Sequence, residues 1–346
     1  MTTLVLAKPG RWTSREEPAP TAADLAAGEA LLRVRALGVC GTDLHAFRGT
    51  QPFFTYPRVL GHELGVEVVA VAPDVSRVRP GDRCAVRPYY SADADDQAVR
   101  RGLPNCGDAL RVLGVHVDGG MRPYLRYRAD ALHPSATLDY DRLALAEPLA
   151  IGRHAADRAG ATAADQVLII GAGPIGLATA LFVAESGARL LVADLAADKI
   201  AQARRLLTGA ETLVVPPGGL PPGVLRGRLG GDLPTVVIDA TGHAGSMNGC
   251  VDLAAPGGTV VFVGLHQGEV RFTDTTFHKK ELTLRASRAA LPEDFERVIR
   301  ALEDGSLDPR PLITHRLAFG RVATDFTGLY ELGDSLTKAI IDFPAP

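Results

Sequence analysis

The segment QVLIIGAGPIGLATALFVA, residues 166–184, decides the fold of this chain. It opens with an apolar run typical of a buried strand, and Gly171, Gly173 and Gly176 follow in a G-x-G-x-x-G spacing. The first glycine permits a tight turn, the second lets a pyrophosphate approach the backbone, and the third lets helix and strand pack closely. The segment carries no charge and is long enough to be taken for a membrane-spanning helix, but its glycines and Pro174 would break such a helix. We therefore predict a strand, a phosphate-binding turn and a helix.

Strands and helices alternate around this segment, which predicts a parallel sheet covered on both faces, a doubly wound α/β fold. We expect strands at residues 166–170, 189–193, 235–238 and 259–263, and helices at residues 175–186, 197–207 and 244–254.

Asp194 follows the last glycine of the turn by 18 residues, at the end of the second predicted strand. An acidic side chain there accepts hydrogen bonds from the adenosine ribose and repels a 2′-phosphate, so we predict NAD rather than NADP. The alternative is that Asp194 only caps the next helix, for which Asp198 is better placed.

Length and composition limit the remaining possibilities. A chain of 346 residues suggests about two domains, and 46% apolar with 22% charged residues is ordinary globular composition. The net charge of −3 and the absence of long basic blocks argue against nucleic acid or a membrane as partner. Four scattered cysteines and a short apolar N-terminus favour a cytoplasmic protein.

Outside the α/β region the chain is rich in β-type residues, notably at residues 30–40 and 64–71. We predict a β-rich domain at 1–148 and 285–346, interrupted by the dinucleotide-binding domain at 149–284.

Two short segments supply a candidate metal site, GVCGTDLH at residues 38–45 and GHELG at 61–65. A thiolate from Cys40 and an imidazole from His62 are a favoured zinc pair, and a catalytic zinc takes three protein ligands with one position open. Taken alone, such a cysteine is most often a small buried residue, and such a histidine a core or surface residue.

With AEPLAI at 146–151, GAGPIG at 171–176 and DATG at 239–242, these segments make the chain recognisable over almost its whole length. It resembles the zinc-dependent medium-chain dehydrogenase/reductase superfamily, in its polyol and sugar-acid branch. Within that branch it looks most similar to bacterial L-galactonate/L-gulonate 5-dehydrogenases. The resemblance implies a GroES-like catalytic domain beside a Rossmann domain.

The resemblance also implies a ligand set. Cys40, His62 and Glu147 would bind zinc, and Glu63 would stand behind the ligands or act as an alternate ligand during turnover. Asp43 would orient His62 through the second ring nitrogen.

Thr42 and His45 would pass the alcohol proton to solvent, as such a pair does in the family. The alternatives are a strand-end cap for Thr42 and a surface side chain for His45. Further cofactor contacts are implied for Pro174, Ile175, Thr241, Val263 and Gly264.

The candidates for contact with substrate are Phe53, Tyr56, His116 and Arg288. An aldonate carboxylate needs a cation in the pocket, and the planar fork of Arg288 suits it. The alternative is that Arg288 is a surface or interface residue.

Many relatives carry a second, structural zinc on four cysteines spaced C-x2-C-x2-C-x7-C. Counting back from Cys106, the other three positions hold Ala92, Asp95 and Ala98. We therefore predict one zinc per chain and a lobe at residues 88–108 that keeps its shape without metal.

These observations predict an NAD-dependent zinc alcohol dehydrogenase acting on a secondary hydroxyl of an aldonate or polyol, as a homodimer or homotetramer. Two rivals remain. One is a non-catalytic NAD(H)-binding protein, and the other is a tailoring dehydrogenase for a cyclitol or secondary metabolite.

Overall fold

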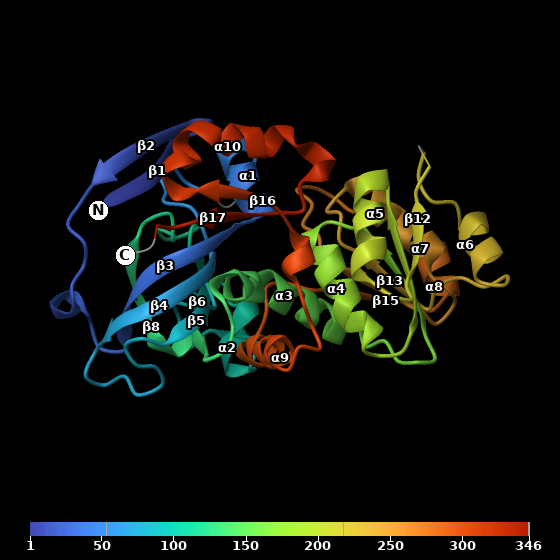
Figure 1. Ribbon diagram of the computed structural model, residues 1–346. Coiled ribbons are helices and arrows are strands. Elements are labelled where there is room, and N and C mark those ends of the chain that lie inside the picture. Colours follow the sequence, from blue (N-terminus) through green and yellow to red (C-terminus); the bar gives the residue numbers. More distant parts are fainter. Residues whose placement is uncertain (53, 217, 345–346) are drawn as a thin grey trace. The chain divides into compact units, whose positions relative to one another are not determined.

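The computed structural model describes residues 1–52, 54–216 and 218–344. The chain divides into two compact units, residues 1–150 with 291–346 and residues 151–290 (Figure 1). These units end two and six residues beyond the boundaries proposed from the sequence. Each unit has its own apolar core.

The first unit is built on a mostly antiparallel sheet in the order β16-β17-β3-β4-β5-β9, with β8 also paired to β3. Its strands are β1 (Thr2–Lys8), β2 (Arg11–Glu16), β3 (Glu29–Val39), β4 (Glu63–Val71), β5 (Arg83–Val86), β6 (Tyr89–Ser91), β7 (Leu110–Val112), β8 (Tyr124–Arg128), β9 (Leu132–Ser135), β16 (Ile313–Ala318) and β17 (Lys338–Asp342). Its helices are α1 (Gly41–Arg48), α2 (Gln97–Arg100), α9 (Pro292–Glu303) and α10 (Val322–Glu331). Helix α3 (Tyr140–Ala159) begins in this unit and ends in the other.

The register of β3 and β4 sets up the candidate metal site. Gly38 of β3 pairs with Glu63 of β4, and Ala339 of β17 pairs with Val39 of β3. The chain therefore leaves β3 at the point where it enters β4, so that residues 40 and 62 are neighbours.

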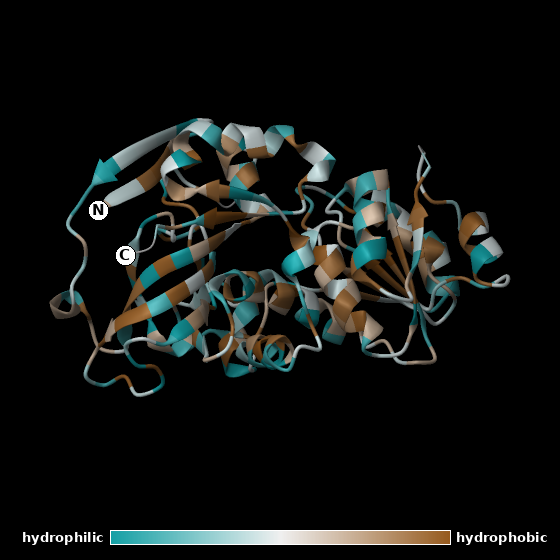
Figure 2. Cartoon of the chain, in the orientation of Figure 1, coloured by the Kyte–Doolittle hydropathy of each residue, from teal (hydrophilic) through white to brown (hydrophobic). Residues whose placement is uncertain are grey.

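The second unit is a six-stranded parallel sheet in the order β12-β11-β10-β13-β14-β15. The strands are β10 (Gln166–Ile170), β11 (Arg189–Asp194), β12 (Glu211–Val214), β13 (Val236–Asp239), β14 (Thr259–Phe262) and β15 (Thr283–Ala286). The helices are α4 (Pro174–Ala184), α5 (Ala197–Leu206), α6 (Pro222–Arg228), α7 (Ala244–Leu253) and α8 (Asp274–Lys279). Figure 2 shows these strands as largely hydrophobic, which suits a sheet covered on both faces.

The doubly wound fold predicted from the sequence is confirmed. All four predicted strands and all three predicted helices of this unit are present, with ends within two residues. The edge strands β12 and β15 were not predicted. The uncharged segment 166–184 is divided between β10 and α4. Among the described residues, no helix is both long enough and apolar enough to span a bilayer.

Candidate metal centre and cofactor site

Cys40 lies where β3 ends and α1 begins, as the N-cap residue of α1. Its backbone N–H donates to Asp43 Oδ2 over 2.9 Å, and its thiol donates to Thr42 Oγ1 over 3.3 Å. The positive end of a helix favours the thiolate form of a cysteine, which is the form that binds metals. The Thr42 hydroxyl therefore stands directly beside the candidate metal ligand.

His62 is buried immediately before β4, beside this thiol. One ligand atom each from Cys40, His62 and Glu63 lie within 4.8 Å of one another. Burial by itself lowers the pKa of His62, but Cys40, Asp43 and Glu147 raise it well above its usual value. The predicted contact with Asp43 is present at ion-pair distance, 4.0 Å from His62 Nδ1 to Asp43 Oδ1, which is too long for a hydrogen bond.

Glu63 is fully buried and paired with a lysine that the sequence did not point to. Lys338 Nζ donates to Glu63 Oε1 and Oε2 over 2.6 and 2.8 Å, and to the Val39 carbonyl over 3.2 Å. Burial lowers the pKa of Lys338, but the acidic groups around it, Glu63 first, raise it above its usual value. The two side chains form a buried ion pair. The signal in the sequence was one lysine at the start of the apolar run KAII.

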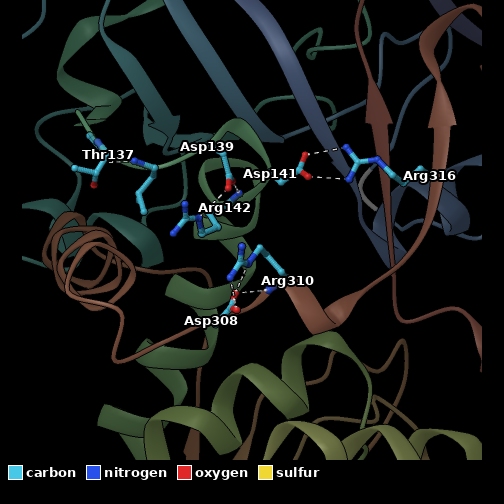
Figure 3. Close-up of polar contacts among 9 residues, drawn as sticks. Thr137, Asp139, Asp141, Arg142, Asp308, Arg310 and Arg316 are labelled. Carbon is cyan, nitrogen blue, oxygen red and sulfur yellow. Dashed lines mark hydrogen bonds and ion pairs between the residues drawn. The ribbon is translucent and has the colours of Figure 1, made fainter.

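Glu147 lies in the middle of α3, outside the cluster of Cys40, His62 and Glu63 but within electrostatic reach of it. Figure 3 shows how the start of α3 is fixed: Arg316 of β16 binds both carboxylate oxygens of Asp141, over 2.7 and 3.1 Å. Asp139 caps the helix by accepting from the Arg142 backbone N–H over 2.8 Å. These contacts hold in place the helix that carries Glu147.

The part of the chain that the structure describes contains five buried acidic residues, Asp43, Glu63, Glu147, Asp239 and Asp294. Four of them accept hydrogen bonds from nearby donors. At Glu147, Oε2 is buried with no hydrogen-bond partner among the described residues, and burial raises its pKa. His62 Nδ1 is buried without a hydrogen-bond partner and faces Asp43 at 4.0 Å. A buried carboxylate with an unpartnered oxygen, within electrostatic reach of an imidazole and a thiol, fits a zinc ion.

His45 projects from α1 and is exposed. Its Nδ1 lies 3.2 Å from Thr50 Oγ1, and this hydroxyl donates in turn to the His45 carbonyl over 3.3 Å. The Thr50 hydroxyl thus lies between the ring and the backbone carbonyl of His45 and holds the ring on the exposed side of α1.

The candidate substrate residues differ in position. The Tyr56 hydroxyl donates to the Ala46 carbonyl of α1, and His116 Nδ1 accepts from the Val112 backbone N–H over 3.1 Å. Arg288 is exposed just after β15 and belongs to the second unit. Phe53 lies outside the described residues.

The lobe at residues 88–108, whose one cysteine is Cys106, is organised by Asp96. Its Oδ1 accepts from the backbone N–H groups of Ala98 and Val99 over 2.7 and 3.3 Å, and its Oδ2 accepts from that of Asp108 over 2.9 Å. The bond from Asp108 contributes most to lowering the pKa of Asp96. A carboxylate thus closes this loop.

The glycine turn of the second unit has the geometry that a dinucleotide requires. Gly171 has φ +100°, and a Cβ at Gly176 would lie 1.8 Å from the Gly171 carbonyl oxygen. A Cβ at Gly173, the N-cap of α4, would meet nothing within 4 Å. Space therefore lies open at the positive end of α4, where Pro174 and Ile175 form the first turn.

The other cofactor candidates follow the ends of neighbouring parallel strands. Asp194 ends β11, where Oδ2 accepts from the Ala172 N–H over 2.7 Å and Oδ1 from the Ala196 N–H over 2.8 Å. Each carboxylate oxygen keeps a second lone pair for a ribose hydroxyl. Thr241 follows β13, while Val263 and Gly264 follow β14. A sheet of this topology binds dinucleotides across this edge.

The same two parts of the chain match known families. Residues 26–137 match the alcohol dehydrogenase GroES-like domain, and residues 174–304 match the zinc-binding dehydrogenase family. The chain belongs to the zinc-binding dehydrogenases of the medium-chain dehydrogenase/reductase superfamily, and it is an oxidoreductase.

Individual relatives within this family are sugar-acid and polyol dehydrogenases. The chain is 40% identical to L-galactonate-5-dehydrogenase of Escherichia coli strain K12, over 96% of this chain and 95% of that protein. It is 34% identical to D-altritol 5-dehydrogenase of Agrobacterium fabrum, over 88% and 90% of the two chains. The structure of an alcohol dehydrogenase (RspB) of E. coli CFT073 in complex with NADH superposes with a TM-score of 0.90 at 31% identity, covering 99% of both chains.

Proposed function

We propose that this enzyme oxidises a secondary hydroxyl of an aldonate to the ketone with NAD⁺, using one zinc bound by Cys40, His62 and Glu147. The observation that carries the metal assignment is the buried Glu147 carboxylate, the one buried acid of the described chain that no protein donor satisfies. A metal-binding thiolate persists in a reducing compartment, which supports a cytoplasmic location.

Zinc, when bound, supplies a Lewis acid that makes the substrate hydroxyl more acidic, and NAD⁺ accepts the hydride. Thr42 orients the substrate hydroxyl, because its own hydroxyl lies beside Cys40 Sγ. His45 receives the proton, and its exposed position on α1 lets it release the proton to solvent. Positioned proton transfer of this kind contributes roughly 10²- to 10⁴-fold in rate.

NAD⁺ rather than NADP⁺ is proposed because of Asp194. Its charge is held at the end of β11 by two backbone N–H groups, and a 2′-phosphate would meet this fixed negative charge. The NADH complex of the structural relative supports the same choice.

An aldonate is favoured over a neutral polyol because the 40% identical relative is an L-galactonate-5-dehydrogenase. Arg288 stays the candidate partner of its carboxylate. The altritol dehydrogenase among the relatives keeps a neutral polyol as the second candidate.

We also propose a homodimer or homotetramer. Strand β15 is an edge of the parallel sheet, and Leu284 on it is 39% exposed. An exposed edge strand of this kind is a template for pairing with another chain.

The test is NADH formation by the purified enzyme across matched aldonates and polyols, together with metal analysis. We expect one zinc per chain and turnover of an aldonate with NAD⁺. The Glu147→Gln variant should fold but lose zinc. Full zinc content in that variant would contradict the role of Glu147 as a zinc ligand. Turnover restricted to neutral polyols would contradict an aldonate as the substrate.

A further inference from the structure

The last residue of β13, Asp239, carries a fully buried side chain at the carboxyl edge of the parallel sheet. Its backbone carbonyl accepts from the N–H groups of Val263 and Gly264 over 2.9 and 3.2 Å. Its Oδ1 accepts from the backbone N–H and the hydroxyl of Thr241 over 2.9 and 2.8 Å, and its Oδ2 accepts from the Ser246 hydroxyl. Asp239 therefore joins the segments that follow β13 and β14 to the start of α7.

This network supports the predicted cofactor residues. The Thr241 side chain, which is bonded to Asp239, lies against the glycine turn, because a Cβ at Gly171 would lie 3.1 Å from Thr241 Cγ2. A Cβ at Gly264 would lie 2.2 Å from the backbone nitrogen of Gly242, so the segments after β13 and β14 also pack tightly on each other. The cofactor edge of the sheet is thus held together around one carboxylate.

The negative charge of this carboxylate has no cation to compensate it. Its three hydrogen-bond donors are a backbone N–H and two hydroxyls, all neutral, and no basic side chain of the described residues forms an ion pair with it. An ionised carboxylate only accepts hydrogen bonds, which matches this set of donors. The positive end of α7 offsets part of the charge. Burial, together with Asp239, raises the pKa of the Cys250 thiol, which lies 3.9 Å from Oδ2.

The order of the strands decides which part of the cofactor experiences this charge. The glycine turn follows β10 and Asp194 ends β11, so the pyrophosphate and the adenosine ribose belong to that half of the sheet. Strands β13 and β14 lie on the other side of β10. The nicotinamide half of a dinucleotide that crosses this edge is left for the ends of β13 and β14. The nicotinamide ring is positively charged in NAD⁺ and neutral in NADH.

We propose that the buried charge of Asp239 strengthens the binding of NAD⁺ relative to that of NADH. A fixed negative charge attracts the ring of the oxidised cofactor and not the ring of the reduced one, and this difference is what shifts the balance between the two forms. The shift favours alcohol oxidation, the direction of the proposed function. This inference rests on the dinucleotide cofactor of the proposed function and deepens it, but it does not depend on the zinc or on the substrate.

The experiment measures the dissociation constants of NAD⁺ and NADH by calorimetric titration of the full-length wild type and Asp239→Asn, without substrate. The amide oxygen in this variant can still accept from Thr241, and the Ser246 hydroxyl can turn to accept from the amide N–H, so the charge is lost while the hydrogen bonds persist. We expect the NAD⁺ constant divided by the NADH constant to rise at least about threefold, the effect of one unit charge in partly hydrated surroundings. Asp232→Asn is the matched control, because it removes an exposed carboxylate just before the other end of β13 and should leave the ratio unchanged.

The outcomes separate this inference from the proposed function. A purely structural role of Asp239 would weaken both forms of the cofactor equally, so a wild-type ratio in Asp239→Asn would overturn the role of the charge. A wild type that binds neither NAD⁺ nor NADH would contradict the cofactor of the proposed function instead.

A second variant covers the case in which circular dichroism shows that Asp239→Asn does not fold. Asp239→Thr is then measured, because a threonine hydroxyl forms the same type of turn with the N–H of Thr241 and carries no charge. It should show the same rise in the ratio, and an unchanged ratio would again overturn the role of the charge.

Discussion

Burial of one histidine predicts a defined loss of stability in acid. His133 of β9 is 3% exposed, and its ring stacks on Phe295 of α9 with centroids 4.8 Å apart. Burial, helped by the positive charges of Arg87 and Arg77, lowers the pKa of His133 to about 3, from 6.5. Between these two values the unfolded chain binds a proton at this residue and the folded chain does not.

The sign and size of the effect follow from this difference. Because the folded pKa is depressed, the stabilisation is complete above pH 6.5 and is lost progressively as the pH falls toward 3. Between pH 7.5 and 4.5 the loss is about 3 kcal/mol, from about two pH units below 6.5 at 1.36 kcal/mol each. His133→Phe keeps an aromatic ring against Phe295 and cannot be protonated, so this variant should escape the loss.

The assay is urea unfolding of wild type and His133→Phe at pH 7.5 and 4.5, with chelator present so that metal binding does not contribute. The difference between their free energies of unfolding should shift by about 3 kcal/mol in favour of the variant at the lower pH. His278→Gln, which alters an exposed histidine, is the matched control. A shift below about 0.5 kcal/mol, the usual size of a surface effect, would refute the reasoning.

Four further predictions concern the site and the lobe. Cys40→Ser should lose zinc and turnover but keep NADH binding, measured by fluorescence titration, because the glycine turn belongs to the other unit. Loss of NADH binding together with zinc would contradict the assignment of Cys40 as a zinc ligand. Asp194→Ala should raise the kcat/KM ratio of NADP⁺ to NAD⁺ by at least about tenfold, since like-charge repulsion is removed. Arg288→Ala should raise KM for an aldonate far more than for a neutral polyol of equal length, and equal losses would remove the carboxylate role. Asp96→Ala should speed proteolytic cleavage within residues 88–108 while zinc content stays at one per chain; unchanged cleavage would show that the lobe does not depend on this carboxylate.

The dinucleotide-binding unit was predictable because its signals are local. A buried strand, a glycine turn and a helix follow one another within residues 166–184, and the pattern repeats along the chain. Strands β12 and β15 were missed for a physical reason: as the two edges of the sheet they are four residues long and mostly exposed or half-buried. They therefore lack the apolar run that marks a central strand.

The candidate metal site was predictable only in part. Cys40 and His62 lie in short motifs whose residue types suggest a metal, whereas Glu147 entered through the family resemblance. Lys338 was not found, because its partner Glu63 lies 275 residues away along the chain and only the pairing of β17, β3 and β4 brings them together. A lysine that opens an apolar strand signals a buried charge but does not identify its partner.

The lobe at residues 88–108, predicted to bind no zinc, determines how a measured zinc content is to be interpreted. A structural zinc on four thiolates closes a loop, and Asp96 closes the same stretch by linking the start of α2 to Asp108, 12 residues further on. The carboxylate does this with backbone N–H groups, which are present whatever metal is supplied. Zinc removal should therefore leave the lobe folded. We therefore expect any zinc bound by the chain to report on the site of Cys40 and His62, and the metal content of the Glu147→Gln variant to need no correction for a second ion.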